Sequence, residues 1–97
     1  KRKEKLNLLV DSSNFELNQV RIQKSINRKL NKTDWGVLNV LLDNPEVSNK
    51  EISEQVFLSI DGIGSSLRRM YVFFAIKETK YKKVLLIKRA IEISKDA

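Results

Sequence analysis

The stretch SNKEISEQVFLSIDGIGSSLRRMY, residues 48–71, has the pattern of two helices joined by a short turn. Ser48 and Glu51 have the spacing of a capping box, in which each side chain accepts a hydrogen bond from a free amide at a helix start. Ser59 is placed to cap the second helix. The apolar residues of that helix recur on one face, at Ile63, Leu67, Met70 and Phe74. A helix of about eight residues, a turn of about three and a longer helix have the spacing of a helix-turn-helix.

Helical periods also dominate the rest of the chain, with no sustained alternation of the kind that strands show. Asn31 is placed to cap a helix that ends near Asp43, where DNPEV interrupts the pattern because a residue before proline disfavours helical geometry. Ser13 and Glu16 have the spacing of another capping box, which predicts a helix over about residues 14–31. We therefore expect an all-α protein, in which a compact four-helix helix-turn-helix domain is preceded by an N-terminal linker helix.

A last helix is predicted over about residues 79–94, with apolar residues on two sides. One stripe consists of Val84, Ile87 and Ile91, and the other of Leu86, Ala90 and Ile93. One stripe can enter the core of the domain. The other would be exposed to solvent unless it meets a second subunit or the N-terminal helix.

The 97 residues are enough for one domain and include neither cysteine nor histidine. Their absence excludes disulfides, Cys/His zinc sites and imidazole catalysis, so we expect neither an enzyme nor a cofactor. No apolar run approaches the roughly 20 residues of a membrane span, and we expect no membrane contact by this segment. The lack of cysteine fits the reducing cytoplasm. Because the first residue is Lys1 rather than methionine, we expect a piece of a larger protein.

The net charge of +7 is concentrated near the N-terminus. Residues 1–32 contain nine Lys/Arg and three Asp/Glu, a balance of +6, whereas the remaining residues contain ten and nine. The later segment KETKYKKVLLIKR, residues 77–89, is also basic. Clustered cations favour a polyanion such as DNA, because binding releases counterions from its phosphates. The alternative is that these cations form the solvated surface of helices.

Several short matches connect this chain to a known family. The segment at residues 48–59 follows the family's pattern SNKEIAxxLxLS at Ser48, Asn49, Lys50, Glu51, Ile52, Leu58 and Ser59. Upstream, the family's Leu, Glu, Val and Leu correspond to Leu30, Asp34, Val37 and Leu38, and its apolar rhythm continues at Ile63, Leu67, Met70 and Tyr71. From Leu30 to about Ile91 the chain thus resembles the LuxR-type DNA-binding domain, also called the GerE or FixJ type, of bacterial transcription regulators.

Three departures from the family concern its DNA-reading helix and one loop. The loop DNPEV is about two residues longer than usual, which a surface loop tolerates. Gly62, Gly64 and Ser66 stand where the family has threonine, a basic residue and histidine. Phe73 replaces a further basic residue, because FFAI stands where the family has KLGV. Two of the family's positive charges are therefore missing from this helix.

The two glycines have two interpretations. Each costs a helix interior about 1 kcal/mol relative to alanine, so they can mark a helix that frays until DNA orders it. Alternatively, the absence of side chains lets the start of the helix lie deeper in the groove, and we favour this interpretation.

Candidate DNA contacts follow from the helical wheel of a recognition helix over about residues 60–74. If the apolar stripe faces the core, the opposite face carries Asp61, Ser65, Arg68 and Val72. Ser65 and Arg68 coincide with positions that the family uses for DNA, and arginine can bind guanine with two hydrogen bonds. The candidate base contacts are Ser65, Arg68 and Gly64. The candidate phosphate contacts, each of which has a solvated surface position as the alternative, are Lys50, Arg69, Lys80, Lys82 and Lys83.

The resemblance also implies a homodimer, since the last helix makes the dimer contact in the family. The corresponding residues here are Val84, Ile87, Lys88 and Ile91. The chain is expected to divide into a basic linker helix at residues 1–30 and the helix-turn-helix domain at residues 31–97. The linker can pair with its copy in a dimer or fold back on the domain. Its cations can extend the phosphate footprint or face solvent: Arg21, Lys24, Arg28 and Lys29.

Three functions are compatible with these features. The first is the sequence-specific DNA-binding output domain of a bacterial transcription regulator, with an upstream sensor or receiver domain as a partner and double-stranded DNA as the ligand. The second is a protein-interaction or dimerisation module that keeps the helix-turn-helix scaffold but has lost specific DNA reading. The third is a sigma-factor-like domain that docks on RNA polymerase, against which the SNKEI match argues.

Overall fold

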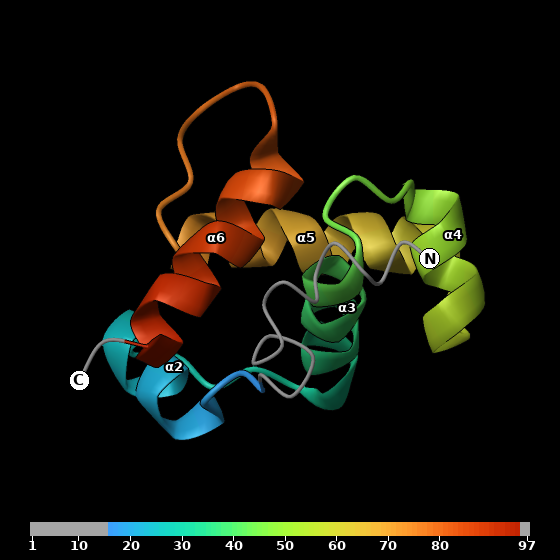
Figure 1. Ribbon diagram of the computed structural model, residues 1–97. Coiled ribbons are helices and arrows are strands. Elements are labelled where there is room, and N and C mark those ends of the chain that lie inside the picture. The colour runs from blue at the N-terminus through green and yellow to red at the C-terminus, as the bar shows by residue number, and fades with distance from the viewer. Residues whose placement is uncertain (1–15, 96–97) are drawn as a thin grey trace, which may run out of the picture.

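The computed structural model describes residues 16–95, and within this range the chain is entirely helical, without strands. The elements are α2 (Gln19–Ile26), α3 (Lys32–Asp43), α4 (Asn49–Val56), α5 (Ile60–Phe73) and α6 (Lys82–Lys95). Figure 1 shows α5 lying across the molecule, with α4 at one end and α2 beneath α6 near the other. The expected all-α fold with a helix-turn-helix is confirmed. No helix in the described part of the chain is long and apolar enough to cross a membrane.

Polar caps begin three of the helices where the sequence predicts them. Asn31 and Asp34 form a capping box at the start of α3, and Ser48 and Glu51 form another at the start of α4. The Ser59 hydroxyl accepts a hydrogen bond of 3.0 Å from the Gly62 amide at the start of α5. Each cap satisfies amides that would otherwise lack a partner in the first helical turn. The boundaries of the helix-turn-helix are therefore fixed by local chemistry.

The N-terminal helix is shorter than predicted. Ser13 lies outside the described residues, Glu16 precedes the helix, and α2 begins only after Asn18, whose side chain accepts from the Arg21 amide. The helix ends at Asn27, which adopts the left-handed conformation with φ 56°. Asparagine tolerates this conformation better than most residues, so a helix to about residue 31 was the wrong prediction. Leu30 still reaches the core, but from a loop.

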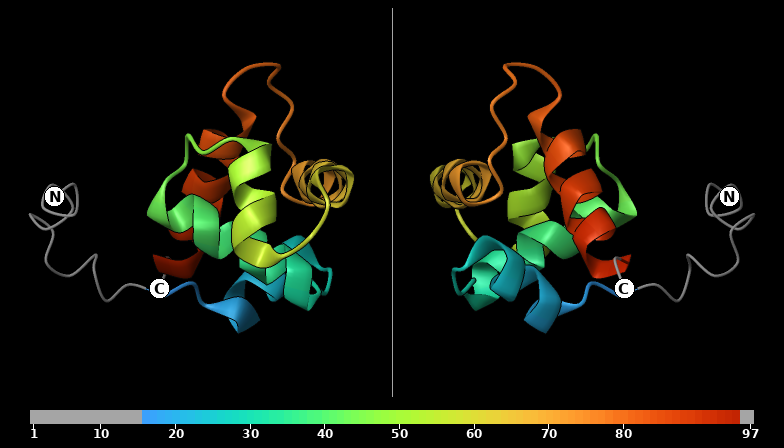
Figure 2. Two further views of the ribbon diagram at one scale, coloured as in Figure 1. Left: turned by 90° about the vertical axis from the view of Figure 1, so that its right-hand side faces the viewer. Right: turned by 90° about the vertical axis from the view of Figure 1, so that its left-hand side faces the viewer.

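The last helix begins at Lys82 rather than near residue 79, and α2 packs against it. The Asn18 amide donates a hydrogen bond of 2.9 Å to the Ser94 hydroxyl, which links the start of α2 to the end of α6. Both views of Figure 2 show α2 against the lower end of α6. The N-terminal helix therefore supplies part of the cover that the two apolar stripes of α6 require.

One hydrophobic core joins all of these helices. Its fully buried large side chains come from every helix and include Ile22, Leu38, Leu41, Ile52, Ile63, Met70 and Leu86. The apolar face of α5 packs on α3, α4 and α6, so this helix is held along one side and free along the other. Figure 2, which looks nearly along α5, shows it at the edge of the molecule. The fold thus presents one face of α5 to solvent.

The end of α5 is a Schellman motif formed without glycine. The Ile76 amide donates to the Tyr71 carbonyl at 2.8 Å, and the Ala75 amide donates to the Val72 carbonyl at 3.1 Å. Ala75 adopts φ 58°, the left-handed conformation that glycine normally occupies at this position. Arg89 of α6 adds a hydrogen bond of 2.7 Å to the Phe74 carbonyl. Helix α6 therefore helps to hold a strained helix end.

Candidate nucleic-acid interface

The outward face of α5 is the one that the helical wheel predicts. Ser65 and Arg68 are exposed, and Val72 is 76% exposed, whereas the opposite stripe lies in the core. Arg68 Nη2 donates a hydrogen bond of 3.4 Å to Ser65 Oγ, so the two side chains lie together. Gly64 is next to them and offers no side chain. The three candidate base contacts form one small surface, and base contact itself stays a prediction.

The other serine and arginine of α5 have a different environment, which sequence reasoning missed. Ser66 Oγ donates to Asp34 Oδ1 at 2.6 Å, and Arg69 Nη2 donates to the same oxygen at 2.5 Å. Asp34 is 1% exposed, and its second oxygen accepts from the Asn31 amide at 3.1 Å. A buried carboxylate with these partners ties α3 to α5, since a buried charge is stable only when it is paired.

This network leaves Arg69 less available for the phosphate contact that the sequence predicts. Its side chain is 39% exposed, and one end of its guanidinium group already binds Asp34. A phosphate would have to use the remaining N–H donors of the group. A sequence signal for the network did exist, because Asp34 precedes Val37, Leu38 and Leu41 on the inward stripe of α3. An acid on an inward stripe requires a partner, and the partners are on α5.

The two glycines of α5 occupy different surroundings. A Cβ atom built on Gly62 would lie 2.9 Å from Cγ of Leu58 and 3.2 Å from Oγ of Ser59, too close for either to stay in place. At Gly64 the nearest atom would be Nη1 of Arg68 at 3.4 Å, an ordinary contact with a flexible side chain. Gly62 is therefore required by the packing of the turn, a reason that neither sequence interpretation included. At Gly64 both interpretations remain.

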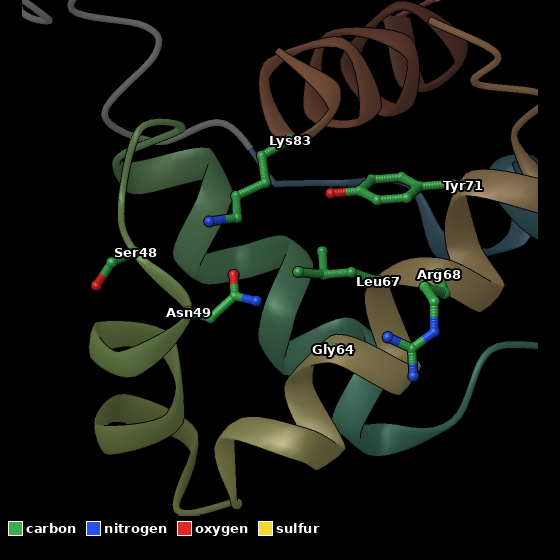
Figure 3. A pocket seen from close by; sticks show the side chains of 7 residues that line it. All are labelled: Ser48, Asn49, Gly64, Leu67, Arg68, Tyr71 and Lys83. Atoms are coloured by element: carbon green, nitrogen blue, oxygen red, sulfur yellow. The ribbon is translucent and has the colours of Figure 1, made fainter. Parts of the chain in front are cut away.

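A groove runs between α4, α5 and the start of α6 (Figure 3). Its lining consists of Ser48, Asn49, Gly64, Leu67, Arg68, Tyr71 and Lys83. Lys83 Nζ donates a hydrogen bond of 2.9 Å to the Val47 carbonyl, and burial lowers the pKa of Lys83. Burial raises the pKa of Tyr71 above its ordinary value. The groove therefore brings two base-contact candidates, Gly64 and Arg68, and one phosphate-contact candidate, Lys83, to the same side of the molecule.

The other phosphate candidates lie in different elements. Lys50 is exposed in the first turn of α4, and Lys80 is exposed in the loop before α6. Lys82 Nζ lies 5.0 Å from the centroid of the Tyr71 ring, a cation–π contact. The Oδ1 atom of Asn49, which points toward the groove in Figure 3, is buried without a hydrogen-bond partner. None of these positions is tested as a DNA contact.

The candidate dimer residues differ in how much surface they offer. Lys88 is exposed, Val84 and Ile91 are half-buried, and Ile87 is only 4% exposed. Ile87 therefore packs within its own chain and has little surface left for a second subunit. The dimer contact stays a prediction, and its accessible part consists of Val84, Lys88 and Ile91.

Comparison with known families agrees with this geometry. Residues 30–70 match the family described as winged helix-turn-helix DNA-binding. The match covers α3 and α4 and most of α5, and it stops before α6. No curated protein and no solved structure matches the chain. The family match and the arrangement of α3, α4 and α5 support a helix-turn-helix DNA-binding domain, and they do not distinguish the LuxR type from others.

Proposed function

We propose that this chain is the sequence-specific DNA-binding domain of a bacterial transcription regulator of the LuxR type, with α5 in the major groove. The observation that carries the proposal is the outward face of α5. There Ser65 and Arg68 are exposed and hydrogen-bonded to each other beside the bare backbone of Gly64. An arginine in this setting can bind guanine with two hydrogen bonds, which discriminates against other bases by about 1 to 3 kcal/mol.

Phosphate contacts would position this face on the duplex without reading its sequence. Lys83 lines the groove beside Arg68. Lys50 lies in the first turn of α4, Lys82 begins α6, and Lys80 lies in the loop before α6. Lys83 is already held near the start of α4 by the Val47 carbonyl. In this proposal these cations bind one strand while Arg68 reaches the bases. The domain would act in the cytoplasm, where a bacterial chromosome is found.

We also propose that the domain acts as a homodimer below an upstream sensor or receiver domain. One short helix with few base contacts gives weak binding, and a second copy on a roughly palindromic site doubles the contacts. The accessible flank of α6 at Val84, Lys88 and Ile91 would supply the dimer contact. Residues 1–30 would connect this unit to the upstream domain.

The experiment starts from a library of randomised DNA duplexes, from which the chain selects its preferred sequence. Fluorescence anisotropy then compares the selected duplex with a scrambled duplex of the same composition. We expect tighter binding to the selected duplex and weaker binding of both as salt increases. Equal affinity for the two duplexes at every salt concentration would contradict the proposal.

A protein-interaction module on the same scaffold is a second candidate, and exposed apolar side chains favour it. Phe57, in the turn between α4 and α5, is 93% exposed, and Val72 is 76% exposed. Burying a large exposed side chain such as Phe57 against a partner is favourable by about 1.5 to 3 kcal/mol. Analytical ultracentrifugation that showed tight self-association, together with an absence of salt-dependent DNA binding, would favour this candidate.

A further inference from the structure

Two exposed cations lie in the connection between α2 and α3, in the part of the chain for which the family resemblance gives no role. They are Arg28 and Lys29, and no carboxylate lies between residues 27 and 33. From the sequence alone these cations are either a phosphate footprint or a solvated linker surface. The contacts of Arg28 in the structure show where this connection lies relative to α5.

Arg28 is held against α5. Its guanidinium carbon lies 5.6 Å from the centroid of the Phe73 ring, and its Nη1 donates a hydrogen bond of 3.0 Å to the Asn27 carbonyl. The loop itself is fixed by the side chain of Gln23, whose Oε1 accepts from the Leu30 amide at 2.8 Å. The Arg28 amide also donates to the Gln23 carbonyl at 3.3 Å. The position of this cation is therefore set before any ligand binds.

The opposite flank of α5 carries a matching arrangement. Lys82 lies over the ring of Tyr71, as Arg28 lies over the ring of Phe73. Tyr71 and Phe73 are two positions apart on one helix, so their side chains leave it in directions about 160° apart. Each aromatic ring thus supports a cation from a different part of the chain, one on either flank of the recognition helix.

The dimensions of the major groove place phosphates along both flanks of a helix bound in it. The groove is about 12 Å wide and a helix with its side chains is about 10–12 Å across, so a helix in the groove has a row of phosphates along each flank. Lys82 would face one row and Arg28 the other. Asp34, at the start of α3, is buried and already paired with Ser66 and Arg69. Within residues 16–95, no carboxylate forms a salt bridge with Arg28.

We propose that Arg28 binds a backbone phosphate of the strand opposite to the one bound by Lys82, which makes the α2–α3 connection part of the DNA interface. This inference rests on the proposed function, since it requires α5 in the groove. It also explains the aromatic residue at position 73, where the resembling family has a basic one. The ring of Phe73 supports a positive charge that the N-terminal segment supplies.

The test is the slope of log Kobs against log salt for the full chain on its selected duplex. Each phosphate contact contributes about −0.9 to this slope. Arg28→Gln should make the slope shallower by about 0.9 and should weaken binding to selected and scrambled duplexes by the same factor. Arg21→Gln is the matched control, because Arg21 is an exposed arginine of α2, the helix that precedes the connection carrying Arg28. It should leave the slope unchanged.

Arg28→Lys separates a phosphate contact from a purely structural role of the Arg28–Phe73 contact. The lysine keeps the charge, so it should restore the slope even if thermal unfolding shows a small loss of stability. A slope unchanged by Arg28→Gln, in a chain that still prefers the selected duplex, would overturn this inference and leave the proposed function intact. A wild-type chain that shows no preference would instead overturn the proposed function.

Discussion

Two serine–arginine pairs stand side by side on α5 and have different surroundings. Ser65 and Arg68 form one pair, and Ser66 and Arg69 form the other, each with the three-residue spacing that brings side chains together on a helix. The first pair faces solvent and is joined by a hydrogen bond of 3.4 Å. The second pair converges on the buried Asp34 at 2.6 Å and 2.5 Å. Identical chemistry thus ties two helices together in one pair and, in the proposed function, contacts DNA in the other.

The two pairs are offset by one residue along α5, which rotates their side chains by about 100° around the helix axis. That step turns Ser66 and Arg69 toward α3 and leaves Ser65 and Arg68 outside. The carboxylate of Asp34 then fixes the orientation of α5 relative to α3. The rigid inner pair therefore sets the direction in which the outer pair points. Variants that separate the two pairs should affect folding and DNA reading independently.

The largest effect is expected when the centre of the inner pair is removed. Asp34→Ala leaves the Ser66 hydroxyl and Arg69 without their acceptor and also removes half of the capping box of α3. We expect a loss of about 3 kcal/mol in the free energy of unfolding, measured by urea denaturation and circular dichroism. Asp43→Ala, an exposed acid of the same helix, is the control and should change stability by less than about 0.5 kcal/mol. Equal losses in the two variants would show that the network is not stabilising.

A second pair of variants compares the two arginines directly. Arg69→Ala leaves the buried Asp34 without the charged partner that the structure gives it, so we expect a loss of about 2 kcal/mol in unfolding free energy. Arg68→Ala removes an exposed side chain and should change that free energy by less than about 0.5 kcal/mol. Urea denaturation of both proteins gives the comparison. If Arg68→Ala were the more destabilising variant, the assignment of inner and outer roles would be reversed.

The two glycines sharpen the comparison because their expected effects have opposite signs. Gly62→Ala places a Cβ against Leu58 and should cost about 1 kcal/mol of stability, since the turn has to shift. Gly64→Ala has ordinary contacts and should add up to about 1 kcal/mol through better helix propensity. Thermal unfolding measures both changes.

DNA binding by Gly64→Ala then distinguishes the two interpretations of this glycine. If the bare backbone lets α5 approach the groove closely, the added methyl group weakens binding although the protein is more stable. If the glycine only allows fraying, the variant binds DNA more tightly. We expect weaker binding.

The smallest effect is expected at Ala75, which belongs to neither pair. The left-handed conformation of Ala75 costs a residue with a Cβ about 1 to 2 kcal/mol, and glycine avoids this cost. Glycine also has more conformational entropy in the unfolded state, which offsets part of the stabilisation. Ala75→Gly should therefore raise the free energy of unfolding by about 0.5 kcal/mol, and it should leave DNA affinity unchanged. A change in DNA preference in this variant would indicate that the end of α5 takes part in reading.

The sequence predicts the parts of this molecule that depend on local chemistry. Caps at Asn31, Ser48 and Ser59 and the apolar stripe of α5 are short-range patterns, and each appears as predicted. The bounds of α2 differ from the prediction, since residues 16–18 are not helical and the helix ends before Asn27. The start of α2 also depends on a long-range contact, the hydrogen bond from the Asn18 amide to the distant Ser94 hydroxyl. Local patterns carry no information about such contacts.

The same limit applies to the candidate site. The exposure of Ser65 and Arg68 follows from helical periodicity alone. The pairing of Arg69 with Asp34, 35 residues away in sequence, depends on how α3 crosses α5. The position of Arg28 beside Phe73 likewise needs the packing of α2. The tertiary fold therefore decides which of several similar cations is free to bind a ligand.

The most direct test of this account is the effect of Arg68→Ala on DNA preference. Anisotropy gives the ratio of the Kd values for the scrambled and selected duplexes, for the wild-type chain and for the variant. The account predicts that the wild-type ratio is well above one and that Arg68→Ala brings it close to one, while some salt-dependent binding to both duplexes remains. A ratio that stays the same in Arg68→Ala would contradict the claim that the outer pair of α5 reads the bases.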